Sequence, residues 1–340
     1  MERMKHLKLN LQLFATQTTE TSTLSAEMKT YYAKRLLDMA EPNLVHRQFG
    51  DSYPIPHGGG KKIEFRKYSS LPKALTPLTE GVTPAGNSLS VTTVEGAVKQ
   101  YGDWIQMSDM LQMTAIDNNV VQATRLLGSQ AGRTMDTIIR EVMQGGTNVM
   151  YAPKVQGGAE EEITSRANLT AECVLTPYVV MRAAATLAAM NAPKINGSYV
   201  LILHPYCQET LQESEGWIDV KKYRDGDAVF NGEIGSIGDV RVVRTSEAKI
   251  FKDETCPASG GGHLAVFGSL LLGANAYGTT EIEGGGLQHI VKQLGYGEDP
   301  LNQRSSCGWK ATSAAVRLCE EYMVRIESCS PIWSARVEAN

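Results

Sequence analysis

Hydrophobic residues recur at helical spacing through one long stretch, from residue 117 to residue 146. Asp117 and Asn118 are favourable N-cap residues, the closing glycine pair is a good stop, and no proline interrupts the run. At about 1.5 Å per residue the predicted helix is about 40 Å long. Asp136 and Arg140, four residues apart, are predicted on its solvent-exposed side. The expected core stripe is Val120, Ala123, Leu127, Ala131, Met135, Ile138 and Val142, widened by Leu126, Ile139 and Met143.

The segment near the N-terminus has a different period. Leu7, Leu9, Leu11 and Leu13 fall on one face at a spacing of two, which predicts a β-strand. A polar tether of Thr, Ser, Gln and Glu over residues 16–25 separates this strand from the rest of the chain. The strand can add to the edge of another sheet or fold back onto its own domain, and both alternatives stay open.

Two strands joined by an irregular segment follow. Lys61–Tyr68 alternates charged and apolar residues, and Val91–Gln100 is the second predicted strand. The intervening residues contain prolines and glycines that forbid regular structure. A two-stranded arm alone is marginally stable in water, so it must lie on its own domain or on a neighbouring copy. A turn is predicted at Tyr101–Trp104, and a short helix from Ser108 to Ile116.

The second half of the chain alternates helices with short apolar strands, as expected of a compact α/β domain. The predicted helices are Tyr178–Asn191, with Pro177 in its first turn, and one from Tyr206 or Cys207 to Trp217; the strands are Ser198–Leu203, Asp239–Arg244 and His263–Phe267. Residues 287–294, 306–317 and 322–327 read as further strands, which we expect to return to the long helix. The α/β domain would then be an insertion between that helix and its sheet.

Length, net charge, cysteine spacing and the lengths of apolar runs exclude several classes of protein. The 340 residues suffice for about two domains, and a net charge of −4 argues against a general nucleic-acid binder. Six scattered cysteines without a CxxC pair favour reduced thiols over a disulfide frame or a zinc site. No apolar run approaches the roughly 18 residues that a membrane span needs, and the N-terminus lacks the apolar block of a signal peptide.

Recognisable catalytic or ligand-binding motifs are absent from the sequence. The Gly58–Lys62 segment lacks the first glycine and the Ser or Thr of a phosphate-binding loop. The histidines occur singly, and neither a nucleophile elbow nor a dinucleotide-binding glycine pattern is present. We therefore expect no catalytic residue, no cofactor and no metal.

The order of these parts resembles that of the major capsid proteins of tailed bacteriophages, which have the Hong Kong 97-type fold. Local segments in the same order strengthen the resemblance, each weak alone and specific together. They are Leu9–Ala15, Thr76–Pro84, Val98–Gly102, Gly128–Thr137, Phe230–Gly235, Asp299–Arg304 and Gly308–Ala311.

The resemblance implies an α+β chain in five parts. They are an N-terminal arm (1–52), an extended loop (53–104), a peripheral domain with the long spine helix (105–172), an inserted axial α/β domain (173–286) and returning strands of the peripheral domain (287–340). It also implies a non-enzymatic coat protein that self-assembles as hexamers and pentamers into an icosahedral shell around phage double-stranded DNA, without sequence-specific DNA binding and without a membrane. Candidate assembly contacts are Leu9, Leu11, Leu13, Lys61, Lys62, Arg66, Lys67, Leu78, Glu80 and Val82.

The resemblance extends to partners. Some family members carry a long N-terminal scaffold segment, but only about 25 residues precede the first predicted helix here (26–39). A separate scaffolding protein is therefore expected, with a portal and optional decoration proteins, and with assembly in the host cytoplasm before the protein resides in the virion capsid.

Two alternatives stay open at this point. An encapsulin-like compartment would share the fold but enclose a cargo enzyme, and an enzyme would need a pocket with clustered ionisable groups between Val174 and Gly286.

Overall fold

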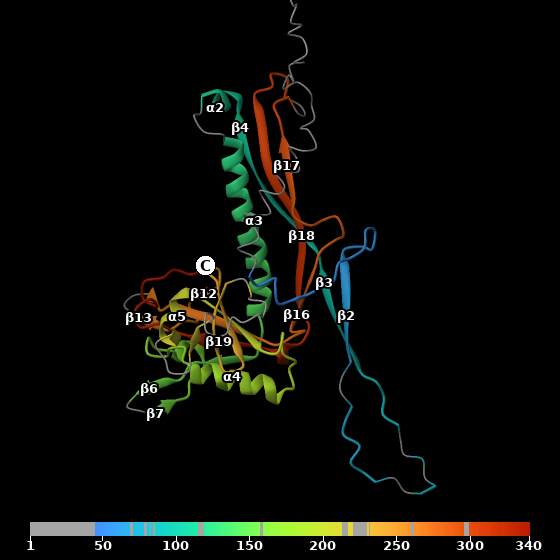
Figure 1. The fold of residues 1–340 in the computed structure, drawn as a ribbon, viewed down its shortest axis with the longest axis vertical. Coiled ribbons are helices and arrows are strands. Elements are labelled where there is room, and N and C mark those ends of the chain that lie inside the picture. Colours follow the sequence, from blue (N-terminus) through green and yellow to red (C-terminus); the bar gives the residue numbers. More distant parts are fainter. Residues whose placement is uncertain are drawn as a thin grey trace, which may run out of the picture.

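The computed structural model describes residues 45–68, 71–77, 80–81, 83, 86–114, 119–156, 159–212, 217–219, 230, 232–259, 262–295 and 299–340. The molecule is elongated (Figure 1). A tall part holds the long helix α3 (Asn119–Gln144) beside the strands β4 (Lys99–Ser108) and β18 (Arg304–Arg317). A compact α/β body lies below it, and a β-hairpin projects from the side of the molecule.

The tall part is one sheet packed on one helix. Its strands lie in the order β1-β16-β18-β17. Strand β4 also pairs with β18, along the edge opposite β17. The short helix α2 (Asp109–Thr114) follows β4 directly. The remaining strands of this sheet are β1 (Asp51–Ser52), β16 (Tyr277–Thr280) and β17 (Gln288–Lys292).

The compact body is built around a second sheet, in the order β5-β19-β15-β8-β11-β10-β9, with β12 paired to β15. Its central strand β8 is buried along its whole length, as predicted for an apolar strand covered on both faces. The strands are β5 (Val149–Tyr151), β8 (Tyr199–Leu203), β9 (Ile218–Asp219), β10 (Glu233–Ile237), β11 (Val240–Arg244), β12 (Lys249–Phe251), β15 (Val266–Leu272) and β19 (Met323–Ser328).

Two helices accompany this sheet: α4 (Pro177–Ala189) and α5 (Pro205–Gln212). Thr176 caps α4 by accepting a hydrogen bond from the backbone N–H of Val179. Smaller pairs and single turns complete the body: β6 (Lys154–Gln156) with β7 (Ala159–Glu161), β13 (Ala258–Ser259) with β14 (Gly262–His263), and the 3₁₀ turns η3 (Arg166–Asn168) and η4 (Glu320–Tyr322).

The predicted helix 117–146 and the two-stranded arm are confirmed. The arm consists of β2 (Lys62–Tyr68) and β3 (Val91–Ala97), which pair antiparallel from Lys62 opposite Ala97 to Tyr68 opposite Val91. The predicted N-terminal strand, the helix at 26–39 and the caps at residues 117 and 118 lie outside the described residues.

Three local predictions are wrong. Tyr101–Trp104 is not a turn, because β4 continues through it in register with β18. Leu126 does not widen the core stripe, since 65% of it is exposed. The last strand, β19, does not join the sheet that packs on α3 but lies between β5 and β15 in the compact body.

The prediction that Asp136 and Arg140 face solvent is also wrong, since both are buried. They belong to a second buried stripe of α3, adjacent to the apolar stripe, with a strict spacing of four residues. We call this the polar stripe; its members are Thr124, Gly128, Gly132, Asp136, Arg140 and Gln144. A spacing of four places side chains one above the other along a helix, so the polar stripe forms a continuous strip of contacts.

Each long side chain of the polar stripe contacts a distant part of the chain. The carboxylate of Asp136 accepts hydrogen bonds from the backbone N–H of His46 (2.7 Å) and lies 2.6 Å from its Nδ1. Arg140 donates to the carbonyl of Glu247 (2.7 Å), and Gln144 donates to the carbonyl of Gly268 (2.8 Å). The helix therefore connects the segment before the hairpin with the turn that precedes β12 and with β15 of the body.

Buried His204 should make the body sensitive to acid. Its Nδ1 accepts a hydrogen bond from the backbone N–H of Tyr206 (3.2 Å), its ring stacks on Phe267, and burial lowers its pKa from 6.5 to about 4. Between these two pH values the unfolded chain binds a proton that the folded chain excludes. Stability is therefore fully present above pH 6.5 and falls by up to about 3 kcal/mol as the pH drops to 4.

We predict that His204→Asn, which keeps an acceptor for Tyr206 but does not titrate, will flatten this pH dependence. Urea unfolding between pH 4 and 8 measures the effect. An unchanged slope in the variant would remove His204 as its source.

We predict that Asp136→Ala lowers the free energy of unfolding by about 3 kcal/mol, because it leaves the buried His46 without its partner. Asp136→Asn should cost less, since its amide oxygen still accepts from the backbone N–H of His46. Arg133→Ala, on the exposed face of the same helix, is the control and should stay within about 0.5 kcal/mol. Urea titrations that give equal losses for Asp136→Ala and the control would contradict the role given to Asp136.

Candidate assembly surfaces

The described contacts between the hairpin and the rest of the molecule lie along the paired strands β2 and β3, which we call the root of the hairpin. Gly96 is its buried residue; a Cβ there would lie 2.5 Å from Cγ2 of Val316 on β18. Phe65 is half-buried against Tyr53, with ring centroids 5.2 Å apart. Gly96 is therefore required because β3 crosses β18 too closely for any side chain.

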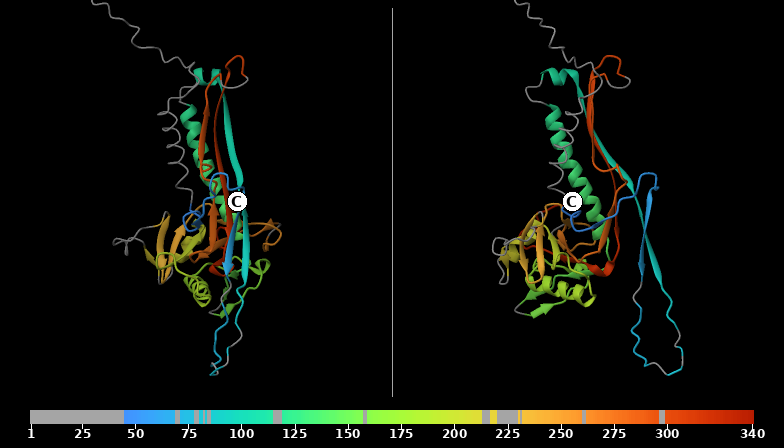
Figure 2. Two further views of the ribbon diagram at one scale, coloured as in Figure 1. Left: turned by 90° about the vertical axis from the view of Figure 1, so that its right-hand side faces the viewer. Right: turned by 45° about the vertical axis from the view of Figure 1, so that its right-hand side comes forward.

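Toward the tip, the hairpin and the irregular segment that closes it expose apolar side chains. Leu75 is 82% exposed and Leu89 is 71% exposed, and Tyr68, Leu71 and Val91 are exposed as well. Figure 2 shows that this part extends away from the compact body. Exposed apolar residues gathered on one projecting segment are typical of an interaction surface.

The sequence-predicted basic residues lie on this hairpin. Lys62 pairs with Glu95 on the neighbouring strand (3.2 Å). Lys67 Nζ lies 3.1 Å from Cys319 Sγ and 3.6 Å from a carboxylate oxygen of Glu321. Two of the four cations therefore contact their own chain.

The other predicted contacts are distributed as follows. Lys61 and Arg66 are exposed on the root, and Glu80 is exposed near the tip. Leu9, Leu11, Leu13, Leu78 and Val82 lie outside the described residues.

A second surface, which sequence analysis missed, lies on the face of β4, β17 and β18 that points away from α3. A groove of about 570 Å³ runs across it, and we call it the sheet-face groove. Its residues are Gln100, Tyr101, Gly102, Asp103, Trp104, Ile290, Lys292, Ser306, Gly308, Trp309 and Lys310. The groove contains Trp104, which is 61% exposed, and the exposed residues Ile290 and Lys310.

Strand alternation explains why this face is open. On β18, Cys307, Trp309 and Ala311 pack on α3, so that the residues between them point to the other side. A Cβ on Gly308 would lie 2.8 Å from Cβ of Trp104, which keeps the groove floor free of side chains. The sequence did contain a signal for this face. Tyr101, Ile105 and Met107 belong to the core, and Trp104 lies on the opposite face of the same strand, but the turn predicted at Tyr101–Trp104 hid this alternation.

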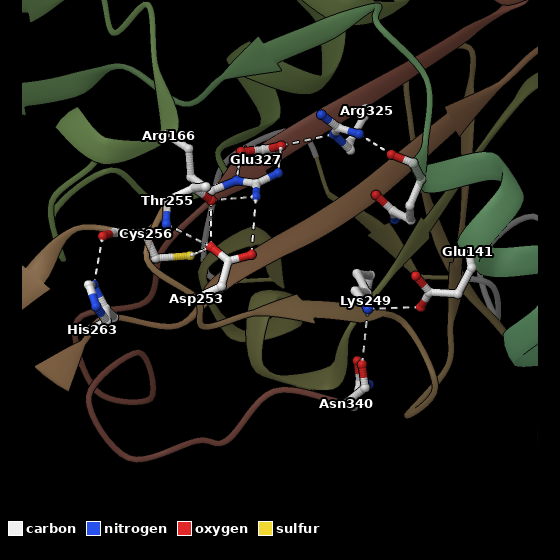
Figure 3. Close-up of polar contacts among 11 residues, drawn as sticks. Glu141, Arg166, Lys249, Asp253, Thr255, Cys256, His263, Arg325, Glu327 and Asn340 are labelled. Carbon is white, nitrogen blue, oxygen red and sulfur yellow. Dashed lines mark hydrogen bonds and ion pairs between the residues drawn. The ribbon is translucent and has the colours of Figure 1, made fainter.

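The compact body contains a group of ionisable side chains, Arg166, Arg325 and Glu327, contributed from outside the segment 174–286 that the enzyme hypothesis requires (Figure 3). Glu327 is fully buried; its carboxylate accepts hydrogen bonds from Arg166 Nε (2.7 Å) and Nη2 (2.6 Å), and Arg325 Nε lies 2.8 Å from it. The hydrogen bond to Glu327 raises the pKa of Arg166, which also lies 3.8 Å over the ring of Phe251. Two permanent cations saturate the carboxylate, so this group stabilises the sheet and offers no general acid or base.

Two further findings concern ligands and membranes. Among the described residues, no group of three or more His, Cys, Asp or Glu side chains is arranged to hold a metal ion. In the same part of the chain, no helix combines the length and apolar character needed to cross a bilayer.

Comparison of the fold with solved structures gives viral shells. The chain is similar to the capsid of Ralstonia phage GP4, with a TM-score of 0.63 and 15% identity over 82% of this chain and 85% of that one. It is also similar to the capsid of Cyanophage P-SCSP1u, with a TM-score of 0.60 and 13% identity over 94% of both chains. The chain is also similar to the mature capsid of bacteriophage PhiM1, with a TM-score of 0.55 and 13% identity over 83% of this chain and 86% of that one.

Identities this low show the fold alone. Sequence comparison goes further, because residues 91–315 match the model of a family described as phage capsid protein, and this match covers more than half of the chain. No curated protein matches the chain. The sequence-based resemblance is therefore confirmed: the chain belongs to the phage capsid protein family, and it is a structural, non-enzymatic coat protein of an icosahedral shell.

Proposed function

We propose that this coat protein forms hexamers and pentamers in which the extended loop of each subunit lies on the next subunit. The observation that carries the proposal is the exposure of Leu71, Leu75 and Leu89 on a segment whose described residues between 71 and 90 are all exposed. Burying them on a neighbour removes this apolar surface from water at roughly 25 cal/mol per Å². A contact between two different surfaces of identical subunits repeats and closes into a ring.

The sheet-face groove is the surface that we assign to the loop of the neighbouring copy. It offers apolar area at Trp104 and Ile290, which matches the exposed leucines of the loop. It also carries Lys292 and Lys310, which are complementary in charge to Glu80 near the loop tip. Exposed ion pairs contribute only about 0–1 kcal/mol each. The charges would therefore fix the position of the loop along the groove, while burial of apolar surface would supply the affinity.

The basic root of the loop has a second role in the proposal. Because Lys62 and Lys67 contact their own chain, Lys61 and Arg66 are the cations that would meet acidic side chains of a neighbour.

The N-terminal segment is proposed as a further link. Its alternating residues Leu9, Leu11 and Leu13 would form a strand on the edge of a sheet, and Leu78 and Val82 would add to the loop contact. The five-part division, 1–52, 53–104, 105–172, 173–286 and 287–340, belongs to the same proposal, with β19 contributed to the sheet of the axial domain.

The proposed content of the shell is phage double-stranded DNA, held without sequence-specific contacts. A net charge of −4 suits a container that releases its genome, since strong neutralisation of phosphates would bind it tightly. The family match favours this content over the cargo enzyme of an encapsulin-like compartment. A separate scaffolding protein, a portal and optional decoration proteins would act during assembly in the host cytoplasm.

We predict that deleting residues 71–85 leaves a folded subunit that forms no closed shells, because the described residues of this loop are all exposed in their own chain. Circular dichroism and thermal unfolding check the fold, and electron microscopy checks the particles. Replacing the same residues by a Gly/Ser segment of equal length is the control for loop connectivity and should also abolish shells. Normal shells from either variant would contradict the role of the loop.

We predict that Lys310→Glu and Glu80→Lys each reduce the yield of closed shells, and that the double variant restores part of it. The reversed pair would attract again across the subunit contact. Arg133→Glu should leave the yield unchanged. It changes the net charge by the same amount as Lys310→Glu, but it lies on α3, on the side of the sheet opposite the sheet-face groove. Sedimentation of assembled particles measures the yield. Additive losses in the double variant would exclude this pairing between Glu80 and the groove.

A further inference from the structure

The contact between Lys67 and Cys319 joins the root of the hairpin to the end of the longest strand. Lys67 is on β2, and Cys319 follows β18, 252 residues later in the chain. The Nζ–Sγ distance is 3.1 Å, and a carboxylate oxygen of Glu321 lies 3.6 Å from Nζ and 3.8 Å from Sγ. The three side chains thus form one small cluster, in which Lys67, a candidate assembly contact by sequence, is held by its own chain.

All six cysteines lie in the described part of the chain, and Cys319 differs from four of the others. Burial raises the pKa of Cys207 and of Cys329 to about 12, and it also raises the pKa of Cys256 and Cys307. These four groups therefore remain unreactive thiols. Cys319 instead has a lysine nitrogen within hydrogen-bond distance, and cationic neighbours are typical of selectively oxidised cysteines.

An oxidant can approach this cluster along a groove between the hairpin and the end of β18. The groove has a volume of about 570 Å³. Its walls include Lys67 itself, and Leu318 and Glu320, the two residues that flank Cys319 in the chain. Lys67 is exposed, whereas Cys319 is buried at the base of the contact.

We propose that Lys67 and Cys319 form a reversible covalent bridge in which one oxygen atom links Nζ to Sγ. The oxidant is dioxygen: the thiol, the neutral amine and one O₂ give the S–O–N bridge and one water. The S–H bond, one N–H bond and the O–O bond break, while one S–O, one O–N and two O–H bonds form. Sulfur and nitrogen each lose two electrons, and the four electrons reduce O₂.

The hydrogen bond with Cys319 is the main cause of the raised pKa of Lys67. Bridging therefore also requires the ammonium group to lose a proton, which the Glu321 carboxylate is placed to accept.

The bridge would fix the hairpin root to its own subunit. Closing a chain loop of this length restricts the unfolded state and opposes detachment of β2. Lys67 is then unavailable to a neighbouring subunit, while the loop tip is left unchanged. The inference holds whether or not that tip lies on the sheet-face groove.

Mass spectrometry of the purified full chain tests the proposal. We expect aerobic incubation to add about 14 Da, the gain of one oxygen and loss of two hydrogens, and dithiothreitol to reverse it. After trypsin, cleavage at Lys67 should be lost and a joined species should appear that contains residues 67–73 and 318–325. Hydrogen exchange of the β2 amides should slow several-fold in the bridged form.

Two variants keep the test decisive. Cys319→Ser removes the sulfur, and Lys67→Arg keeps a cationic donor beside it without a primary amine; both should abolish the mass gain and the joined peptides. Persistence of the gain in either variant would overturn the proposal. So would a Cys319 that stays a thiol, or one that only gains one to three oxygen atoms while trypsin still cleaves at Lys67.

Discussion

The long helix α3 must bury two adjacent stripes at once, and the arrangement of the whole subunit follows from this constraint. Its apolar stripe packs on β4 and β18, which creates the tall part of the molecule. Its polar stripe holds the segment at His46, the turn before β12 and strand β15 of the compact body. Buried charges are tolerated there because each has a partner, so the helix fixes three parts of the chain relative to one another.

This arrangement separates a compact body with its own core from a hairpin that exposes apolar side chains. The compact body has a sheet with fully buried strands and an ion cluster in which the Glu327 carboxylate is saturated by two arginines. The described residues of the hairpin, by contrast, bury one glycine and leave Leu71, Leu75 and Leu89 exposed to water. A coat protein needs both: a body that folds before assembly, and surfaces whose burial rewards assembly.

Much of the fold could be predicted from the sequence because its periodicity was strong. The spine helix, the arm and buried β8 each have an unambiguous spacing. Asp136 and Arg140 were misplaced because a stripe of Thr, Gly, Asp, Arg and Gln carries no hydrophobic signal, although its spacing of four was visible. The position of β19 depends on which strands meet in space, and local periodicity carries no information about that. The sheet-face groove was missed because it requires the registration of β4 against β18 and β17.

The crossing of β3 over β18 has a mechanical consequence. At the crossing, Gly96 faces a methyl group of Val316. Because Gly96 has no side chain, the crossing point itself does little to resist rotation of the hairpin. The contacts that hold the orientation of the hairpin are therefore those of Phe65 with Tyr53 and of Lys67 with Cys319 and Glu321. In the proposed shell, a change in these few contacts would let identical subunits meet at different dihedral angles in the flat and the curved regions of a closed polyhedron.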